Sequence, residues 1–573
     1  MYTASSINLD RYRDNLSARR QYMRYAMIVV MIALVMRAVY LQVLSKDFLQ
    51  NKGDRQYLES MPVTAYRGQI RDRNGEPLAI SAPVQSIWIN GSQIKENDWE
   101  KIDEMARILS LPEQETRSLI KKQSKKKFFY LKRQINPSLA EQISALNING
   151  VYVQREFKRY YPAGAVSAHL LGFTNIDDQG QEGLELEYNQ RLQGAQGAKR
   201  VIKDGKGRVV QEVENISEAV PGQDLALTID ERIQYLAFRE LLAAMRDNQA
   251  KSASLVVLDA KNGDVLAAAS QPTFNPNNRK DYNGESFRNR SMVDSFEPGS
   301  TVKPFVVAAA LDGGYVRPDA VFETHGVYHL GRNVVKDVHN YGFLDLTHVL
   351  TKSSNIAVTQ IAMRIPPKEF WSVYKNLGFG SGSMIGFPGE ASGALLDYQN
   401  WHEFDQATLS FGYGVSTSLL QLARAYTALA DDGVVHSLSL LQRDEDPEQR
   451  RLFKPETARR VREMLEQVTG KEGTAYLARV EGYRVAGKTG TVKKAIKGGG
   501  YSEDKYLSVF VGMAPASAPR FIVAVVVDEP SAGHYYGGQV AAPVFSKVMG
   551  GVLRMYGVEP DGLENMRLLV SKR

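Results

Sequence analysis

One apolar segment near the N-terminus constrains the fold more than any other feature of this chain. Residues 25–44 read YAMIVVMIALVMRAVYLQVL, with Arg37 as their only charged residue. A helix of about 20 residues is about 30 Å long, which matches the hydrocarbon core of a bilayer. The segment therefore predicts one membrane-spanning helix. The alternative is a cleaved signal peptide, because residues 26–36 form an uncharged core of signal-like length, but no small-x-small cleavage pattern follows them.

Basic residues are distributed unevenly around this segment. Arg11, Arg13, Arg19, Arg20 and Arg24 precede it, whereas Lys46, Lys52 and Arg55 follow it among acidic residues. The more basic flank of a spanning helix stays in the cytoplasm. Residues 1–24 are therefore expected to form a cytoplasmic tail, and nearly all of the chain is expected outside the cytoplasm.

The length and composition predict a folded protein with more than one domain. The 573 residues exceed what one hydrophobic core supports, and 43% hydrophobic with 24% charged residues leaves little room for long disordered segments. The net charge of +7 fits an anionic lipid or an acidic polymer as a neighbour and does not imply nucleic acid. The chain has no cysteine, which excludes disulfides, thiolate metal sites and cysteine nucleophiles.

A change of pattern near residue 221 indicates a domain boundary. Short β-branched runs and glycine-rich turns over residues 55–220 predict an irregular α+β module. Its lysine-rich stretch, residues 121–133, is interpreted as solvated surface and not as a nucleic-acid patch. Beyond it the patterns predict a helix over residues 231–245 and two strands joined by a turn at residues 261–263. The expected division is a tail (1–24), an anchor (25–44), the α+β module (55–220), a second domain (221–560) and a C-terminal tail (561–573).

The strongest chemical signal is the sequence Ser-Thr-Val-Lys at residues 300–303. Pro298 and Gly299 interrupt the chain just before it, and an apolar segment typical of a buried helix then runs to Leu311. At helical spacing the amine of Lys303 lies beside the hydroxyl of Ser300. Burial lowers the pKa of a lysine, so that it can accept the serine proton. Ser300 and Lys303 are therefore the candidate nucleophile and base.

The spacing S-x-x-K is not specific on its own. It also occurs at Ser92/Lys95, Ser118/Lys121 and Ser124/Lys127, which are interpreted as surface coincidences. The apolar helix and the order of two further motifs distinguish Ser300 from these pairs.

The second motif is Ser353-Ser354-Asn355, just before a segment with a helical pattern. Serine and asparagine at this position are also typical of a helix N-cap, which is the alternative interpretation.

The third motif is Lys488-Thr489-Gly490-Thr491, on the first of three successive strand-like runs that predict an antiparallel sheet. A glycine within a strand indicates that another backbone comes close, and an extended peptide substrate is the expected neighbour of Gly490. Lys488 and the hydroxyls of Thr489 and Thr491 suit a substrate carboxylate. The alternative is an ordinary hairpin rich in turn residues.

Together the three motifs resemble the S-x-x-K, S-x-N and K-T-G signature of the penicilloyl serine transferases. The second motif reads S-S-N where a common form is S-D-N. Residues 67–79, 155–175 and 535–553 are similar to class B penicillin-binding proteins, most of all to the division-specific type of Gram-negative bacteria, the FtsI or penicillin-binding protein three type. The resemblance implies an α+β penicillin-binding transpeptidase fold, with an antiparallel sheet flanked by helices and an all-helical subdomain. It also implies an N-terminal α+β pedestal, for dimerisation or interaction, and one transmembrane helix.

The resemblance implies a role for each motif residue. Ser300 is expected to be the acylated nucleophile and Lys303 its general base. Ser353 is expected to relay a proton to the leaving amine, and Asn355 to hydrogen-bond Lys303 and the substrate amide. Lys488 and Thr489 are expected to bind the terminal carboxylate beside Gly490. The backbone N–H groups of Ser300 and Thr491 are expected to form the oxyanion hole.

The implied reaction is D,D-transpeptidation of cell-wall stem peptides. The donor is a pentapeptide ending in D-Ala-D-Ala, the acceptor is an amine on a neighbouring stem, and β-lactams trap the same serine. No metal or organic cofactor is expected. The expected partners are a SEDS-type glycan polymerase and other division proteins, with no nucleic acid, and the catalytic domain is expected in the periplasm beside the inner membrane. The alternatives are an elongation-type class B enzyme, a β-lactamase, a β-lactam receptor and an inactive division scaffold.

Overall fold

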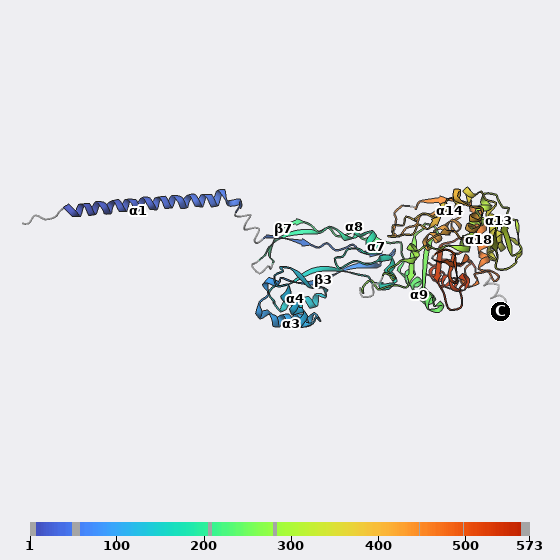
Figure 1. The fold of residues 1–573 in the computed structure, drawn as a ribbon, viewed down its shortest axis with the longest axis horizontal. Helices are drawn as coiled ribbons and strands as arrows, with labels where there is room; N and C mark the ends of the chain where they lie inside the picture. The colour runs from blue at the N-terminus through green and yellow to red at the C-terminus, as the bar shows by residue number, and fades with distance from the viewer. Residues whose placement is uncertain are drawn as a thin grey trace, which may run out of the picture. The chain divides into compact units, whose positions relative to one another are not determined.

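The computed structural model describes residues 7–48, 58–203, 209–278, 284–445, 447–496 and 498–562 (Figure 1). The expected start of the α+β module at residues 55–57 and the tail residues 563–573 lie outside these ranges. The chain divides into two compact units. Unit 1 comprises Met1–Ala65, Ser86–Gln154 and Ala195–Val220, and unit 2 comprises Tyr66–Gln85, Arg155–Gly194 and Pro221–Arg573. Two segments from the N-terminal half therefore belong to unit 2, and the division at residue 220 stays a prediction.

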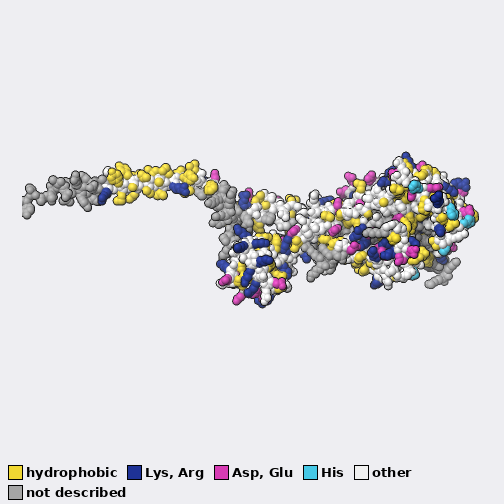
Figure 2. Space-filling view, viewed as in Figure 1, with side chains coloured by type: hydrophobic (Ala, Val, Ile, Leu, Met, Phe, Trp, Pro, Cys, Tyr) yellow, Lys and Arg dark blue, Asp and Glu magenta, His cyan; other side chains and the backbone are white. Residues whose placement is uncertain are grey.

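The apolar N-terminal segment is helical, as predicted. Helix α1 (Ile7–Val39) continues into a π-helical turn, Tyr40–Leu44. The part that is long and apolar enough to cross a membrane is Arg19–Leu44, with a mean hydropathy of 2.3 and no side chain buried by the rest of the protein. Figure 2 shows its hydrophobic side chains as a nearly continuous surface. A surface of this kind is stable only when lipid or another protein covers it.

Unit 1 has a small hydrophobic core between three helices and three strand ends. The helices are α3 (Trp99–Ile108), α4 (Glu113–Lys122) and α5 (Pro137–Ala145), and the strands are β4 (Phe129–Ile135), β3 (Pro77–Ile89) and β5 (Val151–Tyr160). Strands β4 and β5 both pair with β3. Alternation along these strands sends Ile87, Ile89 and Phe129 into the core, because successive side chains of a strand point to opposite faces. A separate antiparallel sheet consists of β1 (Leu58–Val63), β6 (Gly197–Lys203) and β7 (Val209–Ser217).

Unit 2 is built on a five-stranded antiparallel sheet in the order β10-β9-β21-β20-β19. The strands are β9 (Ser252–Asp259), β10 (Val265–Gln271), β19 (Ala486–Ala495), β20 (Tyr501–Ala514) and β21 (Phe521–Asp528). Every residue of β9 and β10 is buried, so both faces of the sheet are covered there. Helices α9 (Glu231–Asn248) and α20 (Ala542–Met555) pack against each other and against the sheet. Helices α16 (Leu419–Ala425) and α18 (Pro455–Val468) each pack against the sheet as well. The predicted helix near residue 231 and all five strands are confirmed.

The buried helix α11 (Lys303–Asp312) packs against α12 (Leu346–Thr351), α13 (Asn355–Ala362) and α14 (Pro367–Leu377), and also against α18. Helix α15 (Glu403–Ser410) packs against α13. Figure 1 shows α13, α14 and α18 grouped in one part of the unit. Helix α11 is buried from Lys303 to Ala310, which is why its sequence is apolar on every side. Two short antiparallel strand pairs interrupt these helices in sequence, a detail that was not predicted. They are β11 (Val321–Thr324) with β14 (Gly342–Asp345), and the enclosed hairpin of β12 (Val327–Leu330) and β13 (Asn333–Lys336).

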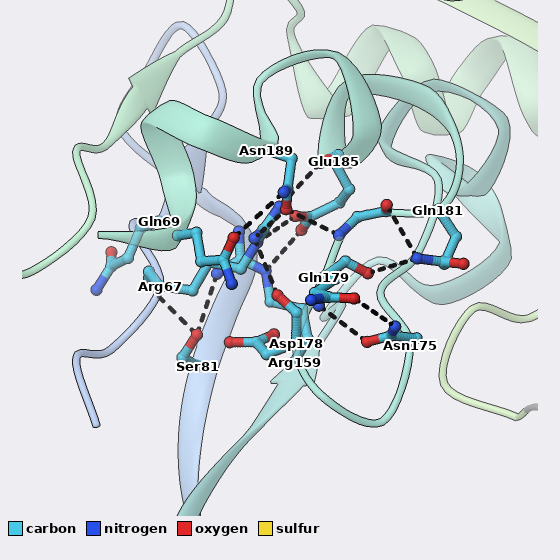
Figure 3. A network of polar contacts seen from close by, with 12 residues as sticks. Arg67, Gln69, Ser81, Arg159, Asn175, Asp178, Gln179, Gln181, Glu185 and Asn189 are labelled. Carbon is cyan, nitrogen blue, oxygen red and sulfur yellow. Dashed lines mark hydrogen bonds and ion pairs between the residues drawn. The ribbon is translucent and has the colours of Figure 1, made fainter. Parts of the chain in front are cut away.

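The N-terminal segments of unit 2 enclose a buried charge cluster (Figure 3). One carboxylate, Glu185 of α7 (Gly183–Glu187), accepts from Arg67 Nε and Arg159 Nε, each at 2.6 Å. The other N–H groups of Arg67 reach the Asn189 side chain at 2.8 Å and the Asp178 carbonyl at 3.0 Å. Buried charges are stable only with such partners, because desolvation of an unpaired ion costs several kcal/mol. The cluster joins residues more than 100 positions apart and fixes these segments within unit 2.

Candidate functional site

Ser300 lies on a tight turn that backbone contacts hold in place. The turn is the 3-10 segment Gly299–Val302, which leads directly into α11. Gly299 has a φ of +56°, and its N–H donates to the Gly412 carbonyl at 3.1 Å. A Cβ atom at Gly412 would lie 2.1 Å from the Gly299 carbonyl oxygen, so only glycine allows this approach. The Ser300 side chain is half-buried, and no hydrogen bond joins it to another described residue, which leaves its hydroxyl accessible.

Lys303 is the first residue of α11, and its side chain is fully buried. Its Nζ donates to Asn355 Oδ1 at 2.7 Å, to the Ser353 carbonyl at 2.6 Å and to Ser353 Oγ at 3.2 Å. Burial, together with the nearby charge of Lys488, holds the pKa of Lys303 well below its usual value, while Asp337 acts in the opposite direction. A lysine with a lowered pKa is neutral often enough to accept a proton near neutral pH.

Ser353 joins the two lysines of the site. Its Oγ accepts from Lys303 Nζ at 3.2 Å and from Lys488 Nζ at 3.0 Å. A hydroxyl oxygen has two acceptor positions, and the two lysines occupy both of them. The hydroxyl proton of Ser353 is then left to donate to a further group. The backbone of Ser353 has a φ of +57°, a conformation that non-glycine residues rarely adopt and that is often found at functional sites.

Lys488 projects from β19, and its side chain is also fully buried. Besides Ser353, its Nζ contacts the Thr489 carbonyl at 3.3 Å and Thr489 Oγ1 at 3.4 Å. Burial lowers the pKa of Lys488 to about 7. Thr489 Oγ1 also lies 3.0 Å from Thr474 Oγ1, which was not predicted as part of the site.

The N-cap interpretation of the second motif holds for Ser354, and the expected catalytic roles of Ser353 and Asn355 stay predictions. Ser354 is the N-cap of α13, because its Oγ accepts from the Ala357 N–H at 3.0 Å. Its neighbour Asn355 orients the amine of Lys303. Asp337 supports both residues: its carboxylate accepts from the Ser354 hydroxyl and from the N–H groups of Asn355 and Ile356. Sequence reasoning missed Asp337, because it lies 17 residues before Ser354 in a loop that follows residue 336, and no periodic pattern marks it.

Strand β19 is the last strand in the order of the sheet, and it pairs with β20 in the register Lys488↔Val511 and Gly490↔Val509. The reason for Gly490 differs from the one expected. A Cβ atom there would lie 3.0 Å from Thr301 Cγ2 and 3.1 Å from the Pro298 carbonyl oxygen, so the close neighbour is the turn that carries Ser300. Gly537 donates its N–H to Thr491 Oγ1 at 3.0 Å, and its own Cβ would lie 2.4 Å from the Gly490 carbonyl oxygen. The two consecutive glycines at residues 537–538 are the sequence feature that could have indicated this close contact.

The structure therefore brings the three predicted motifs together. The alternative S-x-x-K pairs do not share this environment: Ser118, Lys121, Ser124 and Lys127 are exposed in unit 1, as is Ser92. Among the described residues, no group of three or more His, Cys, Asp or Glu side chains is placed to hold a metal ion.

The arrangement has the elements of nucleophilic acyl transfer. It offers an accessible hydroxyl, a buried amine with a lowered pKa one turn away, and a hydroxyl between two lysines. The strand beside it carries a second fully buried lysine, Lys488.

Comparisons with known proteins agree with this geometry. Residues 253–550 match the penicillin binding protein transpeptidase domain, and residues 62–227 match the penicillin-binding protein dimerisation domain. The chain is 41% identical over 540 residues to the peptidoglycan D,D-transpeptidase FtsI of Escherichia coli K12, covering 94% of this chain and 91% of that protein. It is 40% identical over 547 residues to the probable peptidoglycan D,D-transpeptidase PenA of Neisseria gonorrhoeae, covering 95% and 94%.

Solved structures give the same assignment. The transpeptidase domain of penicillin-binding protein 3 from Burkholderia pseudomallei is 43% identical and covers 58% of this chain and 97% of its own, with a TM-score of 0.54. Penicillin-binding protein 3 from Mycobacterium tuberculosis, solved with aztreonam, is 27% identical and covers 87% and 98%, with a TM-score of 0.69. The predicted fold class is confirmed. With both domain matches and relatives of about 40% identity over nearly the whole length, the chain belongs to the class B penicillin-binding proteins.

Proposed function

We propose that this chain is a peptidoglycan D,D-transpeptidase that crosslinks stem peptides through an acyl-enzyme on Ser300. The observation that carries the proposal is the contact of Lys303 and Lys488 with one hydroxyl, that of Ser353, beside the turn that bears Ser300. The names of the relatives support the same activity.

In the acylation step, Ser300 Oγ attacks the carbonyl carbon of the penultimate D-alanine of a donor pentapeptide. Lys303 Nζ, neutral because of its lowered pKa, takes the serine proton. The N–H groups of Ser300 and Thr491 stabilise the negative charge on the carbonyl oxygen. The C–N bond then breaks, and the terminal D-alanine leaves as an amine after it receives a proton through the Ser353 hydroxyl.

In the transfer step, the amine of a neighbouring stem peptide attacks the ester carbonyl. It loses a proton to the lysine and serine pair, and Ser300 recovers its own. Asn355 holds Lys303 in place and hydrogen-bonds the substrate amide, while Lys488 and Thr489 bind the terminal carboxylate. A β-lactam carries a similar carboxylate beside a reactive amide, so it acylates the same serine and blocks both steps.

Labelling with a fluorescent penicillin tests the nucleophile. The full chain in detergent is expected to form a stable covalent adduct, and Ser300→Ala is expected to form none. Ser118→Ala, at an exposed S-x-x-K pair, is the matched control and is expected to label like the wild type. Equal labelling of Ser300→Ala would reject the assignment, and rapid turnover of the drug would indicate a β-lactamase.

We also propose that the protein acts in septum synthesis, with a SEDS-type glycan polymerase and other division proteins as partners. The similarity to FtsI supports the division role. The two domain matches cover most of the chain after the anchor, and neither is a glycan polymerase, so polymerisation is assigned to a partner. Complementation of an Escherichia coli strain depleted of FtsI is expected to restore septation. Rescue of an elongation-type mutant alone would favour the elongation role.

The proposed orientation places residues 1–24 in the cytoplasm and the catalytic domain in the periplasm, with 55–220 as the pedestal and 221–560 as the transpeptidase domain. The uneven arginines support the orientation. Because the chain has no cysteine, single cysteines report it cleanly. A membrane-impermeant maleimide is expected to label Lys368→Cys but not Ser17→Cys in intact spheroplasts. The reverse pattern would contradict the orientation.

A further inference from the structure

Unit 1 carries an aromatic cluster that the proposed chemistry does not use. Trp88 of β3 stacks on Tyr152 of β5, with ring centroids 4.3 Å apart and ring planes at 18°. The ring of Phe128 lies 5.0 Å from Trp88 and 5.0 Å from Tyr130. Phe128 keeps 47% of its surface exposed, and the other three rings are only half-buried. An exposed cluster of this kind on a small unit indicates an interaction surface, because rings that serve only stability are usually buried.

A polar cavity of about 740 Å³ lies beside this cluster. Its polar lining consists of Ser92, Gln93, Lys95, Ser144, Asn147, Asn149 and Tyr152. Tyr152 belongs to both features, because its ring stacks on Trp88 and its hydroxyl donates to Gln93 Oε1 at 2.5 Å. Neutral amides and hydroxyls both donate and accept hydrogen bonds. A cavity lined mainly by such groups suits a ligand that itself carries many hydroxyl and amide groups.

Three lysines lie next to the same cavity wall. The Gly91 N–H donates to the Lys126 carbonyl at 2.9 Å, and a Cβ atom at Gly91 would lie 2.3 Å from the Gln123 carbonyl oxygen. The loop over residues 123–127 therefore packs directly against Gly91, the residue before the cavity-lining residues Ser92 and Gln93. Lys125, Lys126 and Lys127 are exposed, and none forms an ion pair with a described residue. Figure 2 shows several Lys and Arg side chains on the part of unit 1 that holds α3 and α4. A ligand that extends from the cavity to the loop at residues 123–127 is therefore expected to bind more tightly if it also carries carboxylates, because these can pair with the three lysines.

We propose that this surface of unit 1 binds a glycan strand whose attached peptides carry carboxylates. The C–H face of a sugar ring packs on the exposed aromatic cluster, hydroxyl and acetamido groups enter the polar cavity, and Lys125–127 pair with the peptide carboxylates. This inference rests on the proposed function, which makes such a polymer the substrate, and it adds a second binding site on a different unit. An anionic phospholipid surface is less favoured, because it uses the lysines but not a hydrogen-bonding cavity of this size.

The test measures binding by the full chain in detergent micelles to three probes. They are uncrosslinked peptidoglycan strands with stem peptides, the same strands after an amidase has removed the peptides, and phosphatidylglycerol vesicles. Phe128→Ala is expected to weaken binding to both kinds of strand by at least about fivefold, as for an exposed aromatic anchor. Replacement of Lys125, Lys126 and Lys127 by glutamine is expected to weaken binding only to strands that carry peptides, and to reduce the salt dependence of that binding.

A substitution at Asn147, which lines the cavity, tests the cavity separately from the aromatic cluster and the lysines. Asn147→Gly removes a lining amide but keeps the positive φ of 45° at this position, and it is expected to weaken binding to both kinds of strand. Two matched controls are expected to bind like the wild type. Leu119→Ala truncates a 38% exposed side chain elsewhere in unit 1, and replacement of Lys368, Lys471 and Lys547 by glutamine removes the same charge from unit 2.

Labelling by fluorescent penicillin, measured on every variant, separates this inference from the proposed function. Lost strand binding with unchanged labelling supports the glycan site and shows that the variant is folded. A wild-type chain that binds strands but does not label would reject the proposed function and leave the binding site intact. Equal strand binding by the wild type and all variants, or binding to vesicles and not to strands, would overturn the inference.

Discussion

Two of the buried clusters of charged groups in unit 2, one around Glu185 and one around Ser353, differ in how their charges are matched. Around Glu185, two guanidinium groups surround one carboxylate and their remaining N–H groups reach neutral acceptors. Around Ser353, two ammonium groups share one neutral hydroxyl, and the carboxylate that acts on Lys303, Asp337, is engaged with backbone N–H groups.

The comparison explains why one cluster is structural and the other is reactive. Opposite charges in contact stabilise each other's ionised forms, so the cluster around Glu185 fixes distant segments within unit 2. Like charges in a buried position destabilise each other's ionised forms. Burial lowers the pKa of both Lys303 and Lys488, and the charge of Lys488 lowers that of Lys303 further, so that proton transfer becomes possible near neutral pH.

The largest effect is expected from removing the base. Lys303→Met keeps the length of the side chain but removes the amine, and acylation by penicillin is expected to slow by about 10³- to 10⁴-fold. Folding is expected to persist, because an apolar chain replaces a buried polar one. The second-order acylation rate and the melting temperature measure the two effects, with Lys368→Met as the exposed control. Acylation within tenfold of the wild-type rate would show that another group serves as the base.

Breaking the cluster around Glu185 is expected to lower the stability of the protein and to leave acylation nearly unchanged. Glu185→Leu leaves two buried guanidinium groups without their carboxylate, at a cost of about 3–5 kcal/mol in stability. The acylation rate per folded molecule is expected to change little. Urea unfolding and active-site titration separate the two quantities. Glu214→Gln, which breaks an exposed ion pair with Arg200, is the control and is expected to cost under about 1 kcal/mol. A loss of acylation without a loss of stability would assign the cluster a catalytic role.

The lowered pKa of Lys488 is also expected to make the stability of the protein depend on pH. The pKa of Lys488 is about 7 in the folded protein and about 10.4 in an unfolded chain. Between these values the unfolded chain binds the extra proton, so stability is expected to rise with pH by up to about 1.4 kcal/mol per unit. Lys488→Met lacks this contribution. Unfolding free energies at pH 7, 8 and 9 are expected to rise for the wild type relative to the variant, and a constant difference would contradict the lowered pKa.

The smallest effect is expected from the carboxylate that supports Lys303. Asp337→Asn removes the charge that raises the pKa of Lys303, so the acid limb of the acylation profile is expected to move to lower pH. Weaker capping of α13 is expected to cost about 1 kcal/mol. Acylation rates from pH 5 to 9 measure the shift. Asp319→Asn, at an exposed ion pair, is the control, and an unchanged acid limb in Asp337→Asn would separate this carboxylate from the base.

Local patterns predicted the elements that carry the motifs. The apolar run after Ser300 became α11, the segment after Asn355 became α13, and the strand-like runs from residue 486 became neighbouring strands. Each of these depends on residues close in sequence, where periodicity is informative.

The contacts that tune the site were not predictable in the same way. Asp337 acts from a loop that follows residue 336, Ser353 has a positive φ that no local pattern marks, and the neighbour of Gly490 is a turn almost 200 residues earlier. The grouping of residues 66–85 and 155–194 with unit 2 likewise rests on Arg67, Arg159 and Glu185, whose pairing no local pattern encodes. Such features depend on the folded chain as a whole.

The glycines around the nucleophile limit how this protein can evolve under antibiotic selection. A Cβ atom at Gly412 would lie 2.1 Å from the Gly299 carbonyl oxygen, and one at Gly537 would lie 2.3 Å from the Val509 carbonyl oxygen. A Cβ atom at Gly299 would lie 2.5 Å from the Val492 side chain, and one at Gly490 would lie 3.0 Å from the Thr301 side chain. The geometry around Ser300 thus depends on close contacts that a side chain at these glycines would disturb. Resistance substitutions that preserve growth are accordingly expected among side chains that approach the bound drug, and the glycine framework is expected to stay invariant.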